Sequence, residues 1–243
     1  MREPRVHTAN DLTTGSEITL EPGPARHLLK VLRLGPNAPL KLFNGDGGEF
    51  AARLIHADKD RVTAKIEAKL AFEPPPSLPL LLLIGISKGE RMDFAIQKAV
   101  ELGVTRIQPL FCGRSVVQLK GERLQRRLDH WRGIIIGACE QSGRCRLPDL
   151  HPPTKLNTAL DQTLGYDCRL VLHHKGAKAL KELDAPKEAV ALLIGPEGGL
   201  TPAELQLAQS AGFIPLRLGP RVLRTETAPL AALAAIQTLW GDF

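Results

Sequence analysis

The chain has 243 residues, 43% of them hydrophobic and 24% charged, which is the composition of an ordinary globular protein with one large domain or two smaller ones. No apolar run approaches the roughly 18 residues that a membrane-spanning helix needs, and no secretory leader is visible at the N-terminus. The four cysteines form no CxxC pair and no Cys/His cluster with zinc spacing. These features argue against membrane, disulfide-framework and zinc-module classes, so we expect a cytoplasmic protein with free thiols and no bound metal.

Positive charge is concentrated in the middle of the chain. The formal net charge is +6, and residues 85–146 hold twelve Lys and Arg against six Asp and Glu, whereas the segments on either side are nearly neutral. Five of these cations fall within 13 residues: Lys120, Arg123, Arg126, Arg127 and Arg132. Such density is typical of a polyanion-binding surface, although a solvated helix face gives the same pattern. Aromatic residues make up only 4%, which argues against a platform that stacks the bases of single-stranded RNA.

The N-terminal third has the pattern of a small β domain. Short strands are predicted at 18–20, 40–43, 49–55 and 61–66, with one helix at 24–31. The segment 44–48 is a predicted hairpin turn, because its asparagine and glycines tolerate a positive φ. Three consecutive prolines from Pro74 then favour an extended spacer. We therefore predict a β-barrel over residues 1–72, a linker at 73–79 and a second domain over 80–243.

Strands and helices alternate in the second predicted domain. Strands are predicted at 80–86, 107–111, 169–173, 189–194 and 213–218, and helices at 92–102, 122–141, 201–211 and from about 225 to near the C-terminus. The start of the third helix is the clearest, since Thr201 is a predicted N-cap, Pro202 follows it and Glu204 completes a capping box. Alternating βα units predict an α/β fold with a mostly parallel sheet covered on both faces.

The last predicted helix carries more apolar surface than one face of a sheet requires. Its large apolar residues are Leu230, Leu233, Ile236, Leu239 and Trp240. Exposed apolar patches of this kind usually mark interfaces between subunits. We therefore predict a homodimer.

Two loops follow predicted strands and precede predicted helices. One is Gly195-Pro196-Glu197-Gly198-Gly199, and the other spans residues 218–228. Both lie at the C-terminal edge of the sheet, where open α/β folds bind ligands. Their glycines let a ligand approach the main chain closely, although tight strand–helix turns give the same pattern. Neither loop is a dinucleotide-binding or P-loop motif.

These two loops, taken with five other blocks, resemble those of the ribosomal RNA small subunit methyltransferase E family of the SPOUT superfamily. The other blocks are 27–33, 88–94, 97–99, 101–104 and 140–144, and their order matches the family over nearly the whole chain. The resemblance implies an N-terminal PUA-like β-barrel followed by a C-terminal SPOUT α/β domain with a trefoil knot. It also implies a homodimer that uses S-adenosylmethionine to methylate uracil N3 of one uridine in 16S rRNA of the small ribosomal subunit.

The resemblance assigns the loops of the knot to S-adenosylmethionine. The implied cofactor-binding residues are Leu172, His173, Gly195, Pro196, Glu197, Gly198, Gly199, Leu218, Gly219, Val222, Leu223, Thr225 and Thr227. Uracil N3 carries a proton at neutral pH, so methyl transfer to it needs a base or a cation that stabilises the uracil anion. We assign the cation to Arg224 and consider Glu197 and Glu226 as candidate bases or positioning groups. For Glu226, a role at the helix N-terminus is an alternative.

Basic side chains are candidates for contact with RNA. The predicted set comprises Arg2, Arg5, Arg26, His27, Lys30, Arg33, Lys88, Arg91, Arg114, Arg123, Arg126, Arg127, Arg144 and Arg221. Arg2 and Arg5 are expected to form a flexible N-terminus, and the middle segment is expected to carry most of the salt-dependent affinity. Two alternative functions remain: a SPOUT enzyme that modifies the ribose 2′-oxygen or another base, and a non-catalytic ribosome-assembly factor with the same fold.

Overall fold

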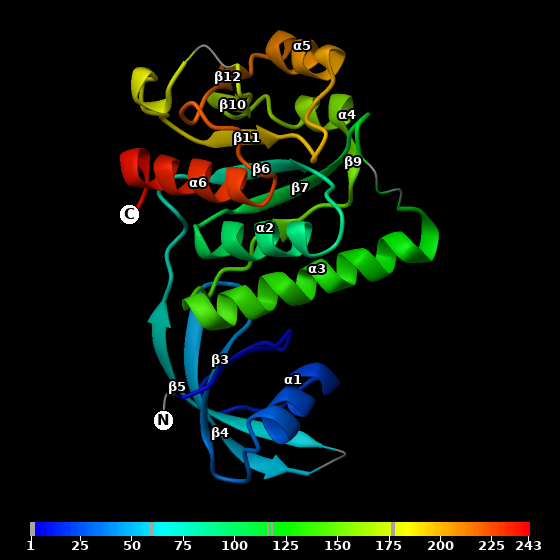
Figure 1. The fold of residues 1–243 in the computed structure, drawn as a ribbon. Helices are drawn as coiled ribbons and strands as arrows, with labels where there is room; N and C mark the ends of the chain where they lie inside the picture. Colours follow the sequence, from blue (N-terminus) through cyan, green and yellow to red (C-terminus); the bar gives the residue numbers. More distant parts are fainter. Residues whose placement is uncertain (1–2, 59–60, 116, 118, 176–177) are drawn as a thin grey trace. The chain divides into compact units, whose positions relative to one another are not determined.

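A computed structural model describes residues 3–58, 61–115, 117, 119–175 and 178–243 of the chain (Figure 1). The chain divides into two compact units. The first unit comprises the residues up to Pro75 together with Ile136–Leu147, and the second comprises Pro76–Ile135 together with Pro148–Phe243. Each unit is built on its own β-sheet. Arg2, a predicted RNA contact, lies outside the described residues.

The first unit contains a five-stranded sheet. In order across the sheet, the strands are β1 (Arg5–His7), β3 (Pro39–Phe43), β4 (Gly48–Ala57), β5 (Val62–Phe72) and β2 (Glu17–Thr19). β1 is parallel to β3, and the other pairs are antiparallel. The four predicted strands and the turn between β3 and β4 are confirmed. β1 was not predicted, because Val6 is its only apolar residue. The outer half of β5 was not predicted either, because it is exposed and its burial does not alternate along the strand.

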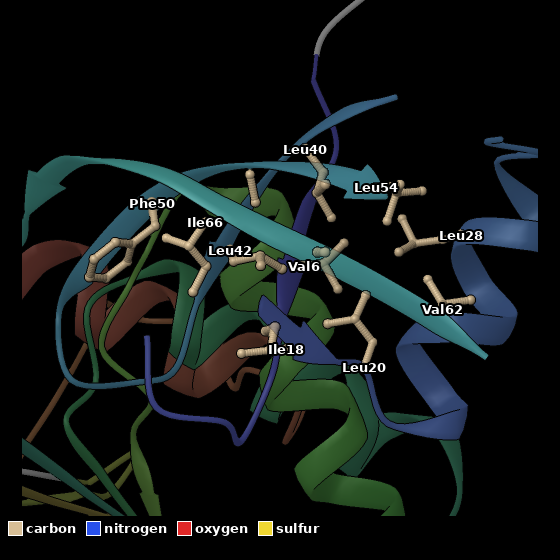
Figure 2. Packing of buried hydrophobic residues seen from close by; sticks show 12 residues of the cluster. Val6, Ile18, Leu20, Leu28, Leu40, Leu42, Phe50, Leu54, Val62 and Ile66 are labelled. Atoms are coloured by element: carbon tan, nitrogen blue, oxygen red, sulfur yellow. The ribbon is translucent and has the colours of Figure 1, made fainter. Parts of the chain in front are cut away.

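The helix predicted at 24–31 is confirmed, although its geometry changes along its length. It begins as α1 (Pro22–Arg26) and continues as the π-helical turn η1 (His27–Val31). Leu28 of η1 is fully buried and points into the apolar core of the first unit (Figure 2). The side chains labelled with it in that core are Val6, Ile18, Leu20, Leu40, Leu42, Phe50, Leu54, Val62 and Ile66. Burial of Leu28 therefore anchors the helix to the sheet.

Arg5 in β1 holds the segment 136–147 within the first unit. Its side chain is only 6% exposed, and its Nε donates a hydrogen bond to Glu49 at 2.7 Å. Its two terminal nitrogens donate to four main-chain oxygens between Cys139 and Arg144, at 2.7–3.2 Å. The prediction that Arg5 belongs to a flexible RNA-contacting N-terminus is therefore wrong, because its donors are already used inside the protein.

The second unit contains a parallel sheet. In order across the sheet, the strands are β12 (Ile214–Leu216), β10 (Cys168–Leu172), β11 (Val190–Ile194), β6 (Leu80–Gly85), β7 (Arg106–Phe111) and β8 (Asp149–Leu150), and β9 (Thr154–Lys155) also pairs with β7. The strand pairs of this sheet that the structure describes are all parallel, which confirms the predicted α/β fold. β8 and β9 escaped prediction because two residues carry no periodic pattern.

Helices cover both faces of the parallel sheet (Figure 1). On one face, α2 (Glu90–Glu101) packs against α6 (Thr227–Trp240). On the other, α4 (Leu156–Asp161) packs against α5 (Pro202–Ser210). The core beneath α4 and α5 includes Leu83 of β6, Leu193 of β11 and Ala208 of α5. The apolar strands are thus buried from both sides, as the sequence predicts.

The long basic helix α3 (Gly121–Ser142) runs from the second unit into the first, since its residues from Ile136 onward belong to the first unit. The helices predicted from periodicity are confirmed, whereas α4 and the 3-10 turn η2 (Leu180–Glu182) were too short to be predicted. Within the described ranges, no helix is long and apolar enough to cross a membrane. The four cysteines are buried free thiols.

Candidate active site

Three loops enclose one pocket of about 890 Å3 in the second unit. They follow β10, β11 and β12, so parallel strands bring them to one edge of the sheet. The predicted cofactor residues that line the pocket are Leu172, His173, Gly195, Pro196, Glu197, Gly198, Gly199, Leu218, Gly219, Val222, Leu223 and Thr225. Thr227 does not line it, because this residue begins α6 and its N–H donates to the carbonyl oxygen of Arg224 at 3.0 Å.

The glycine loop (residues 195–199) folds tightly against itself and against the end of β6. A Cβ atom on Gly195 would lie 2.8 Å from the backbone nitrogen of Leu200, and one on Gly85 would overlap the backbone nitrogen of Pro196. Gly199 has a φ of 68°, a conformation that strains residues with a Cβ atom. Glycine at these positions therefore allows the main chain itself to form the pocket wall. Sequence reasoning missed Gly85, although a glycine at the end of a fully apolar strand was a visible signal.

The glycine loop leads into the capped start of α5. Thr201 Oγ1 accepts a hydrogen bond from the N–H of Glu204 at 3.2 Å, and the Glu204 carboxylate accepts one from the N–H of Thr201 at 2.7 Å, so the predicted capping box is confirmed. The same carboxylate accepts a hydrogen bond from the N–H of Gly113 at 2.7 Å. Burial raises the pKa of Glu204, but these N–H donors outweigh it and leave the pKa below its usual range. An ionised Glu204 therefore connects α5 to the segment after β7.

Arg114 supports the glycine loop from that same segment. Its guanidinium donates to the carbonyl oxygens of Gly198 at 3.0 Å and Leu200 at 3.4 Å. A Cβ atom on Gly198 would lie 2.9 Å from the Cβ of Arg114, so glycine is needed for this close approach. Sequence reasoning assigned Arg114 to RNA contact, whereas the structure gives it main-chain partners in the pocket wall.

Glu197 links the glycine loop to the start of α2. Its Oε1 accepts a hydrogen bond from the N–H of Lys88 at 2.9 Å and lies 3.6 Å from the guanidinium of Arg91. Its Oε2 is buried and has no hydrogen-bond partner among the described residues. Burial raises the pKa of this carboxyl, but the Lys88 N–H and the charge of Arg91 more than offset it, so the pKa is lower than usual. Glu197 is therefore ionised at neutral pH and ties the glycine loop to the segment before α2.

Arg224 and Glu226 line the pocket from the loop that precedes α6. The carbonyl oxygen of Arg224 accepts hydrogen bonds from the N–H groups of Thr227 and Ala228, so its main chain initiates the helix. Its side chain is exposed, and none of the ion pairs found in the described ranges involves it. Glu226 accepts a hydrogen bond from the Thr225 hydroxyl at 3.3 Å and forms no side-chain cap on α6.

His173 contributes an imidazole to the pocket at the end of β10. The main-chain N–H of His173 donates to the carbonyl oxygen of Leu216 at 3.0 Å, and the centroid of its ring lies 4.9 Å from that of His174. Burial, followed by the charges of His174 and Lys175, lowers the pKa of His173. The imidazole is therefore neutral at physiological pH, with one nitrogen able to donate a hydrogen bond and the other able to accept one.

The pocket wall carries a surplus of positive charge. Its basic side chains are Arg91, Arg114, Lys175, Arg217, Arg221 and Arg224, and its acidic ones are Glu197 and Glu226. S-adenosylmethionine has an adenosine, a sulfonium and an amino acid group. The main chain of the glycine loop and apolar side chains such as Leu172 suit its neutral parts, and the negative charges of Glu197 and Glu226 suit its cationic parts. The surplus of cations suits a second, anionic substrate.

The predicted RNA contacts outside the pocket differ in their surroundings. On the N-terminal helix and the turn after it, Arg26, His27, Lys30 and Arg33 are exposed. Lys88 is exposed beside the pocket, with its N–H bonded to Glu197. Arg144 is partly buried, and its Nε lies 3.9 Å from Glu73.

The arginines of α3 face acidic partners. Arg126 pairs with Glu122 at 2.9 Å, and Arg127 lies 3.8 Å from Asp93. Arg132 pairs with Asp129 at 2.8 Å. Arg123 is exposed and has no ion-pair partner in the described part of the chain. Most of the positive charge that made this helix conspicuous in the sequence is therefore locally balanced. No group of three His, Cys, Asp or Glu side chains with metal-binding geometry occurs among the residues described.

Comparison with known proteins gives the same class for both units. The family described as RNA methyltransferase domain matches residues 74–237, and the family described as RNA methyltransferase PUA domain matches residues 25–67. The protein is thus an RNA methyltransferase of the α/β class, and its cofactor is S-adenosylmethionine.

Individual relatives narrow this class. Ribosomal RNA small subunit methyltransferase E of Buchnera aphidicola is 34% identical, over 99% of this chain and 95% of the relative. A structure of ribosomal RNA small subunit methyltransferase E from Neisseria gonorrhoeae, bound to S-adenosylmethionine, is 42% identical with a TM-score of 0.92 over 100% of both chains. A Legionella pneumophila structure with bound SAM is 38% identical with a TM-score of 0.96, also over 100% of both. The chain belongs to the ribosomal RNA small subunit methyltransferase E family.

Proposed function

We propose that this enzyme transfers the methyl group of S-adenosylmethionine to uracil N3 of one uridine in 16S rRNA of the small ribosomal subunit. The observation that carries the proposal is the pocket itself. It joins a glycine-rich wall to a free guanidinium and an excess of cations, in a chain whose relatives are named for the small-subunit rRNA. Such a substrate would place the protein in the cytoplasm.

Arg224 is the proposed catalytic cation. Uracil N3 becomes nucleophilic only when its proton leaves, and the resulting negative charge spreads onto the neighbouring carbonyl oxygens. A guanidinium with no acidic partner can pair with such an oxygen and stabilise the developing anion. S-adenosylmethionine, when bound, supplies an electrophilic methyl group on a sulfonium. Because the carbonyl oxygen of Arg224 also begins α6, its main chain is fixed at the pocket rim, from which the side chain can reach a substrate.

Glu197 is proposed as a positioning residue rather than as the base. A carboxylate whose pKa is below its usual range is a weak proton acceptor near neutral pH. Its Oε1 fixes the glycine loop to Lys88, and its negative charge lies in the pocket wall, where it can attract the cationic groups of a bound cofactor. Glu226, whose carboxylate accepts only from the Thr225 hydroxyl among the described residues, is the better candidate for the base.

We also propose the finer features of the fold that the family resemblance implies. The first unit would be a PUA-like barrel, in support of which the PUA family matches residues 25–67. The C-terminal loops would form a trefoil knot, in support of which three successive βα loops converge on one pocket. The proposed boundaries remain 1–72, 73–79 and 80–243, with residues 136–147 of the later domain grouped with the first unit.

The enzyme is proposed to be a homodimer that associates through α6. This helix contains no charged residue, and Leu239 on it is 52% exposed. Leu230 and Trp240 are only partly buried in the single chain. We expect Leu239→Glu to shift the sedimenting mass from dimer to monomer at micromolar concentration, because the charge cannot be buried against a second copy. A wild-type protein that sediments as a monomer would contradict the dimer.

Primer extension on 16S rRNA from a strain that lacks this gene tests the proposed reaction. N3 methylation blocks Watson–Crick pairing, so wild-type rRNA should stop reverse transcriptase at one uridine and rRNA from the deletion strain should not. A stop that persists in the deletion strain would refute the proposal. Loss of a 2′-O-methyl nucleoside instead would favour the ribose alternative, and no change in any nucleoside would favour a non-catalytic assembly role.

A further inference from the structure

Two large aliphatic side chains are exposed at the end of η1. Val31 is 65% exposed and Leu32 is 39% exposed, whereas Leu28, one turn earlier, is fully buried. Neither exposed side chain belongs to the core cluster of the first unit. Two adjacent exposed aliphatic side chains form a small apolar surface that a partner could cover.

The backbone at this place is also unusual. η1 is a π-helical turn, a rare geometry that is frequently found at functional sites. Arg33, directly after it, has a φ of 53°, in the left-handed region that residues other than glycine seldom adopt. A left-handed residue directly after a helix is a common helix ending, and here it turns the chain sharply at Arg33. Here the hydrogen bonds from the N–H of Leu32 to His27 and from the N–H of Leu34 to Leu28 hold the turn.

The charged side chains along this stretch of the sequence have one sign. Between Glu21 and Asp46 the sequence contains no Asp or Glu. Arg26, Lys30 and Arg33 are exposed in this stretch, and none of them forms an ion pair with any residue that the structure describes. We call residues 26–33 the basic turn. A partner that covers it must tolerate several cations beside an apolar contact, which is the chemistry of RNA phosphates next to a base.

We propose that the basic turn is an rRNA-binding element in which Val31 and Leu32 cover the face of an unstacked base while Arg26, Lys30 and Arg33 contact the flanking phosphates. This inference rests on the proposed function, because it takes the rRNA of the small subunit as the ligand. It gives the aliphatic pair a direct role in recognition. It also makes the first unit the main source of substrate affinity.

Photocrosslinking from position 31 tests the proposal directly. Val31→p-benzoylphenylalanine should crosslink to 16S rRNA when it is irradiated with small ribosomal subunits from the deletion strain. Leu70→p-benzoylphenylalanine is the matched control, since Leu70 is a 48% exposed aliphatic residue on β5 of the same unit. A crosslink to a ribosomal protein or to a second copy of the chain would overturn the proposal. So would an rRNA yield no higher than that from position 70.

A second variant measures the contribution of the aliphatic pair. Val31→Ala/Leu32→Ala should weaken binding to these subunits about tenfold without changing the salt dependence, because no phosphate contact is lost. In this double variant, the affinity for S-adenosylmethionine and the melting temperature should stay at wild-type values. The control variant Leu70→Ala should also keep both values. Unaltered subunit affinity would overturn the inference. Failure of the wild-type enzyme to methylate the subunits would instead refute the proposed function.

Discussion

Helix α3 and the basic turn both present arginines to solvent, but their electrostatic surroundings are opposite. On α3, Arg126, Arg127 and Arg132 each face a carboxylate within 4 Å. In the basic turn, no carboxylate lies between Glu21 and Asp46 in the sequence, and the cations have no ion-pair partners in the described ranges. The number of cations in the sequence therefore favours α3 as the phosphate-binding region. The number of cations without an acidic partner among the described residues favours the basic turn.

Arg224 in the pocket differs from the cations of both regions, because replacing it should slow methyl transfer and leave binding intact. Arg224→Lys keeps the charge but loses the planar fork that can pair with a uracil carbonyl. We expect kcat to fall about 100-fold, the size of effect seen on removal of one anion-stabilising donor, with unchanged affinities for rRNA and S-adenosylmethionine. Raising the pH should partly restore the rate, because more uracil ionises unaided. Lost cofactor affinity with a normal rate at saturation would show that Arg224 is a cofactor ligand.

Neutralising the basic turn should have the next largest effect, and on binding alone. Arg26→Gln/Lys30→Gln/Arg33→Gln should weaken binding to the small subunit about 30-fold and lower the slope of log K against log salt by about two to three. Titrations at several salt concentrations give both numbers. A wild-type slope in this variant would mean that the basic turn does not contact phosphates.

The matched change on α3 should be small. Arg123→Gln/Arg126→Gln/Arg132→Gln removes three cations from the helix, but two of them are paired with Glu122 and Asp129. We expect less than about a threefold loss of subunit affinity and a slope lowered by about one, from Arg123. The sequence alone predicts that this middle segment carries most of the salt-dependent affinity for RNA. An equal or larger loss than in the basic-turn variant would reverse the comparison between the two regions.

The smallest expected effect is on stability and depends on Glu197. Its pKa is lower in the folded protein than in the unfolded chain, so its ionised form stabilises the fold at neutral pH, and this contribution is lost as pH falls through the folded-state pKa. Glu197→Gln should therefore reduce the free energy of unfolding at pH 7 and make no difference under acidic conditions. Urea titrations across this range would measure the gap, and a gap that does not change with pH would show that the charge is irrelevant.

Much of the pocket could be predicted from sequence because its signals are local. Glycines at strand ends, the capping box of Thr201 and Glu204 and the alternation of apolar strands with helices each depend on residues close in the chain. The same reasoning failed for Arg5, whose main-chain partners lie more than 130 residues away in sequence. It also missed the contact between Arg114 and Gly198, which joins segments 84 residues apart. Ion pairing and burial between distant segments are set by the fold, so no local pattern records them.

We propose that the enzyme uses this pocket to methylate N3 of uridine. Mass spectrometry of nucleosides from 16S rRNA tests it most directly, after small subunits from the deletion strain are incubated with purified enzyme and isotope-labelled S-adenosylmethionine. We predict labelled 3-methyluridine with the wild-type enzyme. With Arg224→Lys, the yield of labelled 3-methyluridine at early times should be strongly reduced. Label in a 2′-O-methyl nucleoside or in another base, or no label at all, would contradict it.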